Sequence, residues 1–529
     1  MKTRSTSKAA FFNPRVLVGF ALCSAGLLIG LVGLSNSVTG TIATTSTANS
    51  VPTVKPQRYT VTDLGTLGGT FGYASAVNNK GWADGAATLP GDTAQHAVLW
   101  LKERKINIGT FGGPNSAVFG KGLNERGQVV GAAETSTPDP LGQNFCGMGT
   151  GLVCSPFIWQ NGVMTQLPTL GGYNGIIYDV NNRGVMAGQA QNTTLDPTCT
   201  ASTQEAKPVL WENGQIQELP TVPGDNDGNA YEINDRGQAV GSSGNCPDFG
   251  SAHAVLWENG TLTDLGNFGG TMNNAAFDIN NRGQVVGSSD LPGDTGHAFL
   301  WTKEGGLQDL GTLPGDTASS TGGINDKGQV VGASCTTVEG NCRAFLWQNG
   351  VMTDLNTLIP HNSPLFLFVA FDINSRGQIV GFAFLPSSGE FHAFLATPCD
   401  EDQADAAGCE DRAGAATAAP GDTRERPKIV LPEKVRTLLQ QLWGHRHRSE
   451  SAAPAWTPPP TYYGYCQATD FSGRWQTNGD CVSHNLLGFC YIQGSADCPN
   501  GRRVRQLSSI SCGGLGSAEI DFSRSCSFR

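Results

Sequence analysis

Charged residues are scarce in this chain, at 15 % of 529 residues, and the acidic ones prevail, giving a formal net charge of −11. Residues 59–397 hold 30 acidic and only 14 basic residues. Such an acidic body excludes nucleic acid as a partner, because phosphate binding needs a positive field. The low charge, modest aromatic content and 70 glycines favour many short strands joined by tight turns over helical bundles.

Common catalytic signatures are also missing. There is no Gly-x-Ser-x-Gly elbow, no His-Glu-x-x-His motif and no phosphate loop. Asp225–Asn229 resembles a calcium loop in composition, but its glycine comes too early and the twelfth position lacks glutamate, so we interpret it as a turn. We predict no catalytic, cofactor-binding or metal-binding residues and no cofactor.

The N-terminus has the pattern of an export signal. Lys2, Arg4, Lys8 and Arg15 precede an uncharged apolar run, residues 16–34, and a Ser/Thr-rich tail. The apolar run is long enough that an uncleaved membrane anchor is the alternative. Residues 1–50 therefore predict a secreted, periplasmic or cell-surface protein whose membrane contact, if any, is made through this segment.

One phrase recurs seven times: an aliphatic residue, Asn, a variable residue, Lys or Arg, and Gly. The mean spacing of about 49 residues lies in the range of four-stranded propeller blades. Each phrase follows the first strand of a four-strand unit and precedes the other three. The third strand of the unit ends in tryptophan in six of the seven copies. We name these strands A to D. The asparagines of the phrase are Asn78, Asn124, Asn181, Asn234, Asn280, Asn325 and Asn374.

The ends of the series predict a closed ring. It opens at residues 59–64 with a D strand that no A, B or C strand precedes, and it closes at 392–395 with a C strand that no D strand follows. If the first strand completes the last blade, the result is a seven-bladed β-propeller over 59–397 without open ends. Another blade count or an open solenoid is the alternative.

The repeated sequence motifs resemble those of a known repeat family. His-Ala-Phe-Leu-Trp at 297–301, Asp-Leu-Gly-Thr-Leu-Gly-Gly at 63–69 and the recurring Ile-Asn-x-x-Gly-Gln-Val-Val-Gly phrase are similar to the bacterial HAF-family extracellular repeat. The likeness covers about 59–397 and implies an exported repeat protein, built as a propeller, with no settled activity. Units two and three depart from it, with Ser155-Pro156 and Lys207-Pro208 in place of His-Ala. The histidines that do recur are interpreted as structural: His96, His253, His297 and His392.

Alternating strands would place the tight A–B and C–D turns on one face and the B–C and D–A loops on the other. The B–C loops are longest in units two and three. Because binding usually uses variable loops on a rigid scaffold, we expect a ligand face there, near units two to four; merely tolerated insertions are the alternative.

The cysteines indicate disulfides, because an even set of 14 lies beyond the export segment. Two pairs each share a B–C loop, and a third joins loops of adjacent blades; these are Cys146 with Cys154, Cys335 with Cys342, and Cys199 with Cys246.

The basic residue of the repeated phrase recurs at the A–B turn in every blade. These seven residues would form a cationic ring near the channel mouth that attracts an anionic glycan or an acidic partner. A turn position that simply favours long solvated side chains is the alternative. The members are Lys80, Arg126, Arg183, Arg236, Arg282, Lys327 and Arg376.

Residues 398–461 are Ala/Pro-rich and charged, which predicts a linker, with a short helix at 431–443 that docks on the propeller or on a partner. Residues 462–529 form a small module that three disulfides are expected to hold, in unassigned pairing. Its cysteines are Cys466, Cys481, Cys490, Cys498, Cys512 and Cys526.

Together these features predict an exported binding or scaffold protein that engages an extracellular glycan or an envelope protein. A propeller-based polysaccharide lyase or glycoside hydrolase is one alternative, which would gather unpaired acids and a His or Tyr at one channel mouth. A purely structural envelope protein is another.

Overall fold

The computed structural model describes residues 57–399, except 103, 200–202, 247–252, 271–273, 294 and 337–340. Beyond these it describes 409, 427, 429, 431, 435–436 and the strands between 465 and 518. The export segment predicted at 1–50 lies outside the described residues. The described part of the chain has no helix with the length and apolarity needed to cross a bilayer.

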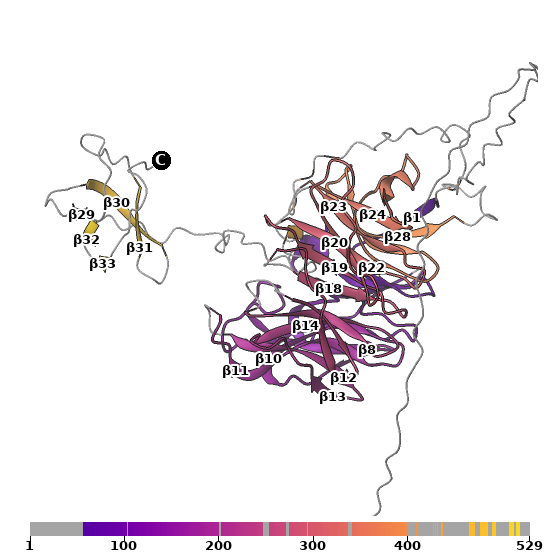
Figure 1. The fold of residues 1–529 in the computed structure, drawn as a ribbon, viewed down its shortest axis with the longest axis horizontal. Helices are drawn as coiled ribbons and strands as arrows, with labels where there is room; N and C mark the ends of the chain where they lie inside the picture. The colour runs from indigo at the N-terminus through magenta and orange to yellow at the C-terminus, as the bar shows by residue number, and fades with distance from the viewer. Residues whose placement is uncertain are drawn as a thin grey trace, which may run out of the picture. The chain divides into compact units, whose positions relative to one another are not determined.

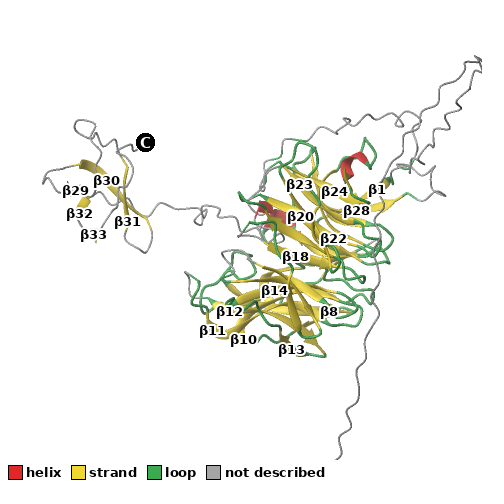
Figure 2. Cartoon of the chain, viewed as in Figure 1, coloured by secondary structure: helices red, strands yellow, loops and turns green. Residues whose placement is uncertain are grey.

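Residues 59–398 form seven four-stranded antiparallel sheets, nearly all strand and loop (Figures 1 and 2). The first three sheets, in order from inner to outer strand, are β2 (Gly72–Val77), β3 (Ala83–Thr88), β4 (Gln95–Trp100) and β5 (Lys105–Asn107); β6 (Gly112–Ala117), β7 (Val129–Pro138), β8 (Leu152–Gln160) and β9 (Val163–Gln166); and β10 (Gly171–Val180), β11 (Met186–Leu195), β12 (Gln204–Glu212) and β13 (Gln215–Glu218).

The next three are β14 (Asp227–Ile233), β15 (Ala239–Gly244), β16 (His253–Glu258) and β17 (Thr261–Asp264); β18 (Asn274–Ile279), β19 (Val285–Asp290), β20 (Gly296–Thr302) and β21 (Gly306–Asp309); and β22 (Ala318–Ile324), β23 (Val330–Cys335), β24 (Cys342–Gln348) and β25 (Val351–Asp354). Each is one blade, numbered 1 to 6 along the chain.

Blade 7 is built from both ends of the series. Strands β26 (Phe366–Ile373), β27 (Ile379–Leu385) and β28 (Glu390–Pro398) are completed by β1 (Tyr59–Gly65). β1 runs antiparallel to β28, from Tyr59 opposite Pro398 to Gly65 opposite Ala393, and Figure 1 shows the indigo strand beside the orange one. The predicted seven-bladed propeller, closed by its N-terminal strand, is confirmed.

The repeated histidines have the predicted structural role. In each blade that carries one, the imidazole Nδ1 bonds a side chain on the neighbouring D strand, as His253 does with Asp264 at 2.8 Å. In blade 7 the same pair joins the two ends of the chain, because His392 on β28 bonds Asp63 on β1 at 2.9 Å. The hydrogen bond that the ring donates to the Asp63 carboxylate raises the pKa of His392.

Three of the repeated tryptophans tie their blade to the one before it. The indole N–H of Trp100 donates to the Leu64 carbonyl, and those of Trp211 and Trp257 donate to the Pro168 and Pro220 carbonyls. The predicted Asn-Gly hairpins are also confirmed, since Asn161, Asn213, Asn259 and Asn349 have positive φ near 52° and the following glycines are positive too.

In six blades a β-bulge interrupts the inner strand A. One residue of strand A is left unpaired just before the last two residue pairs that A forms with strand B. In β18 the register skips from Ala276 to Asp278, so that Phe277 is the extra residue. A Cβ on Gly287, opposite the bulge, would collide with the Ala275 carbonyl oxygen, which explains the glycine of each B strand. The bulge redirects side chains into the central channel.

Outside the propeller, a five-stranded sheet has the order β31-β30-β29-β32-β33. Its strands are β29 (Tyr465–Asp470), β30 (Thr477–His484), β31 (Phe489–Gln493), β32 (Leu507–Cys512) and β33 (Leu515–Ala518). The three disulfides predicted for this module lie outside the described side chains. Of the predicted helix 431–443, the described part is Val435–Arg436.

Candidate functional site

A closed ring of asparagines surrounds the channel at the tight-turn face. The side-chain amide of each repeat asparagine donates to the backbone carbonyl of the asparagine in the next blade, at 3.0–3.2 Å, and Asn374 returns the series to Asn78. Each side-chain oxygen also accepts two backbone N–H groups of its own turn, as Asn280 does from Arg282 and Gln284. The repeated phrase therefore locks neighbouring blades together.

The seven basic residues predicted as a cationic ring are all exposed at the A–B turns. None forms an ion pair with a described residue. The heads of several members extend toward the next blade: the guanidinium groups of Arg183 and Arg282 lie against Gly237 and Gly328, and the Lys80 ammonium donates to the Glu125 backbone carbonyl. The ring thus forms a rim around the mouth, outside its lining.

The mouth itself is a polar cavity of about 190 Å³. Asparagines of the ring line it together with the residue that follows each of them, including Glu125, Asp235 and Asp326. Deeper in the channel it is bounded by Asp179, Glu232, Asp372 and one cation, Lys121. The tight-turn face therefore has a cationic rim and an acidic interior.

Lys121 owes its central position to an insertion in blade 2. The ladder of β6 and β7 ends at Ala117 opposite Ala132 and resumes with the bridge of Leu123 to Val129. Three residues, 119–121, therefore stand where the other blades have one bulged residue. The two extra residues carry Lys121 among the carboxylates, where its ammonium bonds Asp278 and lies 3.0 Å from Asp372 and 3.9 Å from Glu232.

The carboxylates come from the position after the bulge. Asp179, Glu232, Asp278 and Asp372 occupy it in blades 3, 4, 5 and 7, and Asp84 on β3 bonds the corresponding backbone N–H in blade 1. Three of them also bond the next blade: Asp179 accepts from the Ile233 N–H, Asp278 from Ile324 and Asp372 from Val77.

Burial in this cluster shifts the acids strongly. It raises the pKa of Asp84, Asp179 and Glu232 well above the usual range, and it raises the pKa of Asp278 despite the nearby ammonium. Burial alone would lower the pKa of Lys121, but Asp278, Asp372 and Glu232 outweigh it and raise the value further. The ammonium form of Lys121 is therefore favoured by its carboxylate neighbours, whereas burial disfavours the charged form of the acids.

On the loop-face side of Lys121 the channel is aromatic. A second cavity of about 60 Å³ is lined by Lys121, Glu232 and five rings. Tyr231 lies between two of its neighbours in edge-to-face contact, with ring centroids 5.0 Å from Tyr178 and 5.7 Å from Phe277. The five rings are Phe119, Tyr178, Tyr231, Phe277 and Phe371.

The loop face carries the three disulfides expected from the sequence, Cys146–Cys154, Cys199–Cys246 and Cys335–Cys342. The long B–C segments of blades 2 and 3 are partly strand, because β7 and β11 each have ten residues against six in β15 and β19. A ligand face near units two to four stays a prediction.

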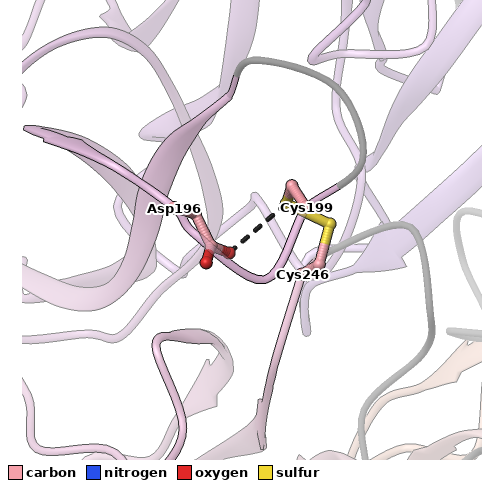
Figure 3. Close-up of side chains that lie close together, drawn as sticks. All are labelled: Asp196, Cys199 and Cys246. Atoms are coloured by element: carbon pink, nitrogen blue, oxygen red, sulfur yellow. Dashed lines mark hydrogen bonds between the residues drawn. A yellow bond between two sulfur atoms is a disulfide. The ribbon is translucent and has the colours of Figure 1, made fainter.

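Asp196 lies beside the Cys199–Cys246 disulfide, with its Oδ2 3.3 Å from the Cys199 sulfur (Figure 3). The three residues have the proximity of metal ligands, but the sulfurs are bonded to each other. Burial and the hydrogen bond that the Asp227 carboxyl donates to Asp196 raise the pKa of Asp227 to about 8, and accepting this bond helps lower the pKa of Asp196 to about 2. This pair therefore shares a proton in a structural role.

A fourth disulfide, Cys399–Cys409, was missed from the sequence because both cysteines lie at the edge of the predicted linker. Further along, Leu431 and Val435 are buried in the same hydrophobic cluster as Phe119, Phe371 and the Cys146–Cys154 disulfide. The linker therefore docks on the propeller of its own chain, the first of the two arrangements expected.

The channel cluster was also missed. In blades 3, 4, 5 and 7 an aromatic residue and an acid stand three and two residues before the repeat asparagine, and this recurring pair is the signal that the sequence contained.

No protein-family model and no curated protein matches this chain. Among solved structures, the β-propeller domain of the Trilobed protease from Pyrococcus furiosus, described as having an open velcro topology, is 10 % identical with a TM-score of 0.35, covering 62 % of this chain and 93 % of its own. AofleA from Arthrobotrys oligospora is 11 % identical with a TM-score of 0.30, covering 56 % and 88 %. Porphyromonas gingivalis dipeptidyl peptidase 4 is 11 % identical with a TM-score of 0.31, covering 60 % and 51 %.

Proposed function

We propose that this propeller protein is an exported binding protein that holds an acidic extracellular polymer on its tight-turn face. The observation that carries the proposal is the rim of seven exposed basic side chains, one per blade, without ion pairs to described residues. Half of the 14 basic residues of the propeller are concentrated there. A polyanion can span several of these charges at once, so that weak single contacts add.

An exported location is supported by two features. Four disulfides in the described residues are the property of a protein that folds in an oxidising compartment. The resemblance of the repeats to HAF-family extracellular repeats points to the same location. Both features fit a ligand such as an acidic glycan of the envelope or its surroundings.

Binding of polygalacturonate, alginate and heparin to the purified chain tests the proposal, with neutral dextran as the reference polymer. The triple variant Arg126→Gln, Arg236→Gln, Lys327→Gln removes alternate charges of the rim and is expected to weaken binding at least about tenfold. The control triple Lys102→Gln, Arg104→Gln, Lys303→Gln removes the same charge from C–D turns and is expected to bind like the wild type. Equal affinity of wild type and rim variant would refute the proposal.

A second candidate function, a propeller-based lyase or glycoside hydrolase, is favoured by the channel. Lys121, the shifted carboxyls and Tyr178 and Tyr231 converge there, which is the combination expected of the enzyme alternative. The same polysaccharide samples, assayed for unsaturated uronates and new reducing ends, distinguish cleavage from binding. Cleavage that Glu232→Gln abolishes would assign the enzyme function, whereas intact polymers would leave binding.

A further inference from the structure

We propose that the aromatic cavity on the loop-face side of Lys121 binds the head group of an alkylammonium ion, with Glu232 as its counter-charge. This site is separate from the cationic rim, which lies at the other end of the channel and would take ligands of the opposite charge. The proposal rests on the lining of the cavity, the partners of Glu232 and the size of the space.

The bulges build the lining. In blades 3, 4, 5 and 7 the residue that the ladder skips is aromatic, and blade 2 supplies Phe119 at the start of its insertion. Blade 1 contributes Ser75, and blade 6 contributes Thr321 and Gly322, so neither adds a ring. The faces of aromatic rings carry partial negative charge, and a cation held within about 6 Å of them is attracted without needing a hydrogen bond.

Glu232 supplies the charge. It is 8 % exposed and lines the cavity together with Lys121. The ammonium of Lys121 is taken up by Asp278 and Asp372 and stays 3.9 Å from Glu232, beyond hydrogen-bond distance. Among the described residues, no side chain and no backbone N–H donates a hydrogen bond to the Glu232 carboxyl group. In the empty cavity burial disfavours the charged form of Glu232 and raises its pKa, and a cation bound beside it would stabilise the carboxylate and lower that pKa again.

The same channel already stabilises an ammonium ion. The ammonium of Lys121 lies among the carboxyl groups of Glu232, Asp278 and Asp372, and the acids Asp84 and Asp179 are buried nearby. Two of their buried oxygens, Asp84 Oδ2 and Asp278 Oδ1, have no hydrogen-bond partner. The cluster therefore has room, in electrostatic terms, for a further positive charge.

Size and chemistry select the ion. A volume of about 60 Å³ corresponds to roughly four water positions at ~15 Å³ each, which suits a group of four or five non-hydrogen atoms such as trimethylammonium. A metal ion needs several converging oxygen ligands, and among the described residues the carboxylates of the channel make no such group. Aromatic rings suit an organic cation instead.

Calorimetric titration with choline tests the site, with 3,3-dimethyl-1-butanol as the uncharged analogue of the same shape. Choline is expected to bind at least about tenfold more tightly than the alcohol, because only the charge differs. A parallel titration with Nα-acetyl-trimethyllysine amide shows whether the site takes the head group from a free small molecule or from a protein side chain. Binding of choline alone assigns a small-molecule ligand, and binding of both assigns recognition of the head group itself.

Two variants address the residues. Tyr231→Leu and Glu232→Gln are each expected to weaken choline binding at least about tenfold, and Tyr173→Leu, an exposed tyrosine at the start of blade 3, to leave it unchanged. A cooperative urea-unfolding transition followed by tryptophan fluorescence shows that each variant is folded. No saturable choline binding, equal binding of the uncharged alcohol, or indifference to both variants would overturn the proposal.

Discussion

Removing one asparagine from the ring should cost more stability than a surface turn residue can explain. Asn280 is 5 % exposed and makes four side-chain hydrogen bonds. Its amide donates to the Gln284 side chain at 2.9 Å and to the Asn325 carbonyl of the next blade at 3.0 Å. Its oxygen accepts from the N–H groups of Arg282 and Gln284. At about 1 kcal/mol net for each bond, their sum is roughly 4 kcal/mol.

Some of this loss is recovered, because the freed N–H groups lie at a turn that water reaches. We therefore expect Asn280→Ala to lower the free energy of unfolding by about 2–3 kcal/mol. Urea unfolding followed by tryptophan fluorescence measures it, with Asn281→Ala, the next and more exposed residue, as the matched control expected to lose less than about 1 kcal/mol. Equal midpoints for Asn280→Ala and the wild type would refute the view that the ring locks the blades.

Three further predictions concern closure, the channel and the bulges. Tyr59, the 1 %-exposed first residue of β1, anchors the seam, so Tyr59→Ala should destabilise by about 3–5 kcal/mol in urea, whereas Thr62→Ala on the exposed side should not. The pKa values of Asp84, Asp179, Glu232 and Asp278 are raised on folding, so above about pH 4 the folded state holds more protons than the unfolded chain, and stability should fall as pH rises. The melting temperature should therefore be higher at pH 5 than at pH 8. Lys121→Met should widen this difference in melting temperature, and an unchanged difference would count against the cluster. Gly287→Ala should prevent folding or cost more than about 3 kcal/mol, since its Cβ meets fixed backbone, while Gly293→Ala on an open turn should cost about 1 kcal/mol by the same denaturation assay.

The closed propeller could be predicted because each blade repeats the same sequence motifs and because the series begins with a D strand and ends without one. Turn chemistry was readable for the same reason: Asn-Gly pairs and the Asn-x-x-Gly phrase act locally. Three cysteine pairs followed from their places in equivalent loops. In each case the decisive interaction lies within one repeat or between neighbouring ones.

The channel was harder because its chemistry depends on a bulge. An alternating strand sends only every second residue to one side, so Tyr231 and Glu232 would be expected on opposite faces. The bulge brings both toward the axis, and nothing in the strand residues alone announces it. The direction of the rim guanidinium groups likewise depends on glycines of the adjacent blade, such as Gly237, which only the assembled ring places nearby.

The strand that completes blade 7 is the first part of the propeller to be synthesised, and its partner is the last. Tyr59 must wait for Pro398, so six blades are formed and stacked before the seam can close. During that interval β1 has no strand partner, and its edges are available to other chains. Chaperones or proteases that recognise unpaired edges would therefore find this protein vulnerable until its final strand emerges, and resistant as soon as His392 meets Asp63.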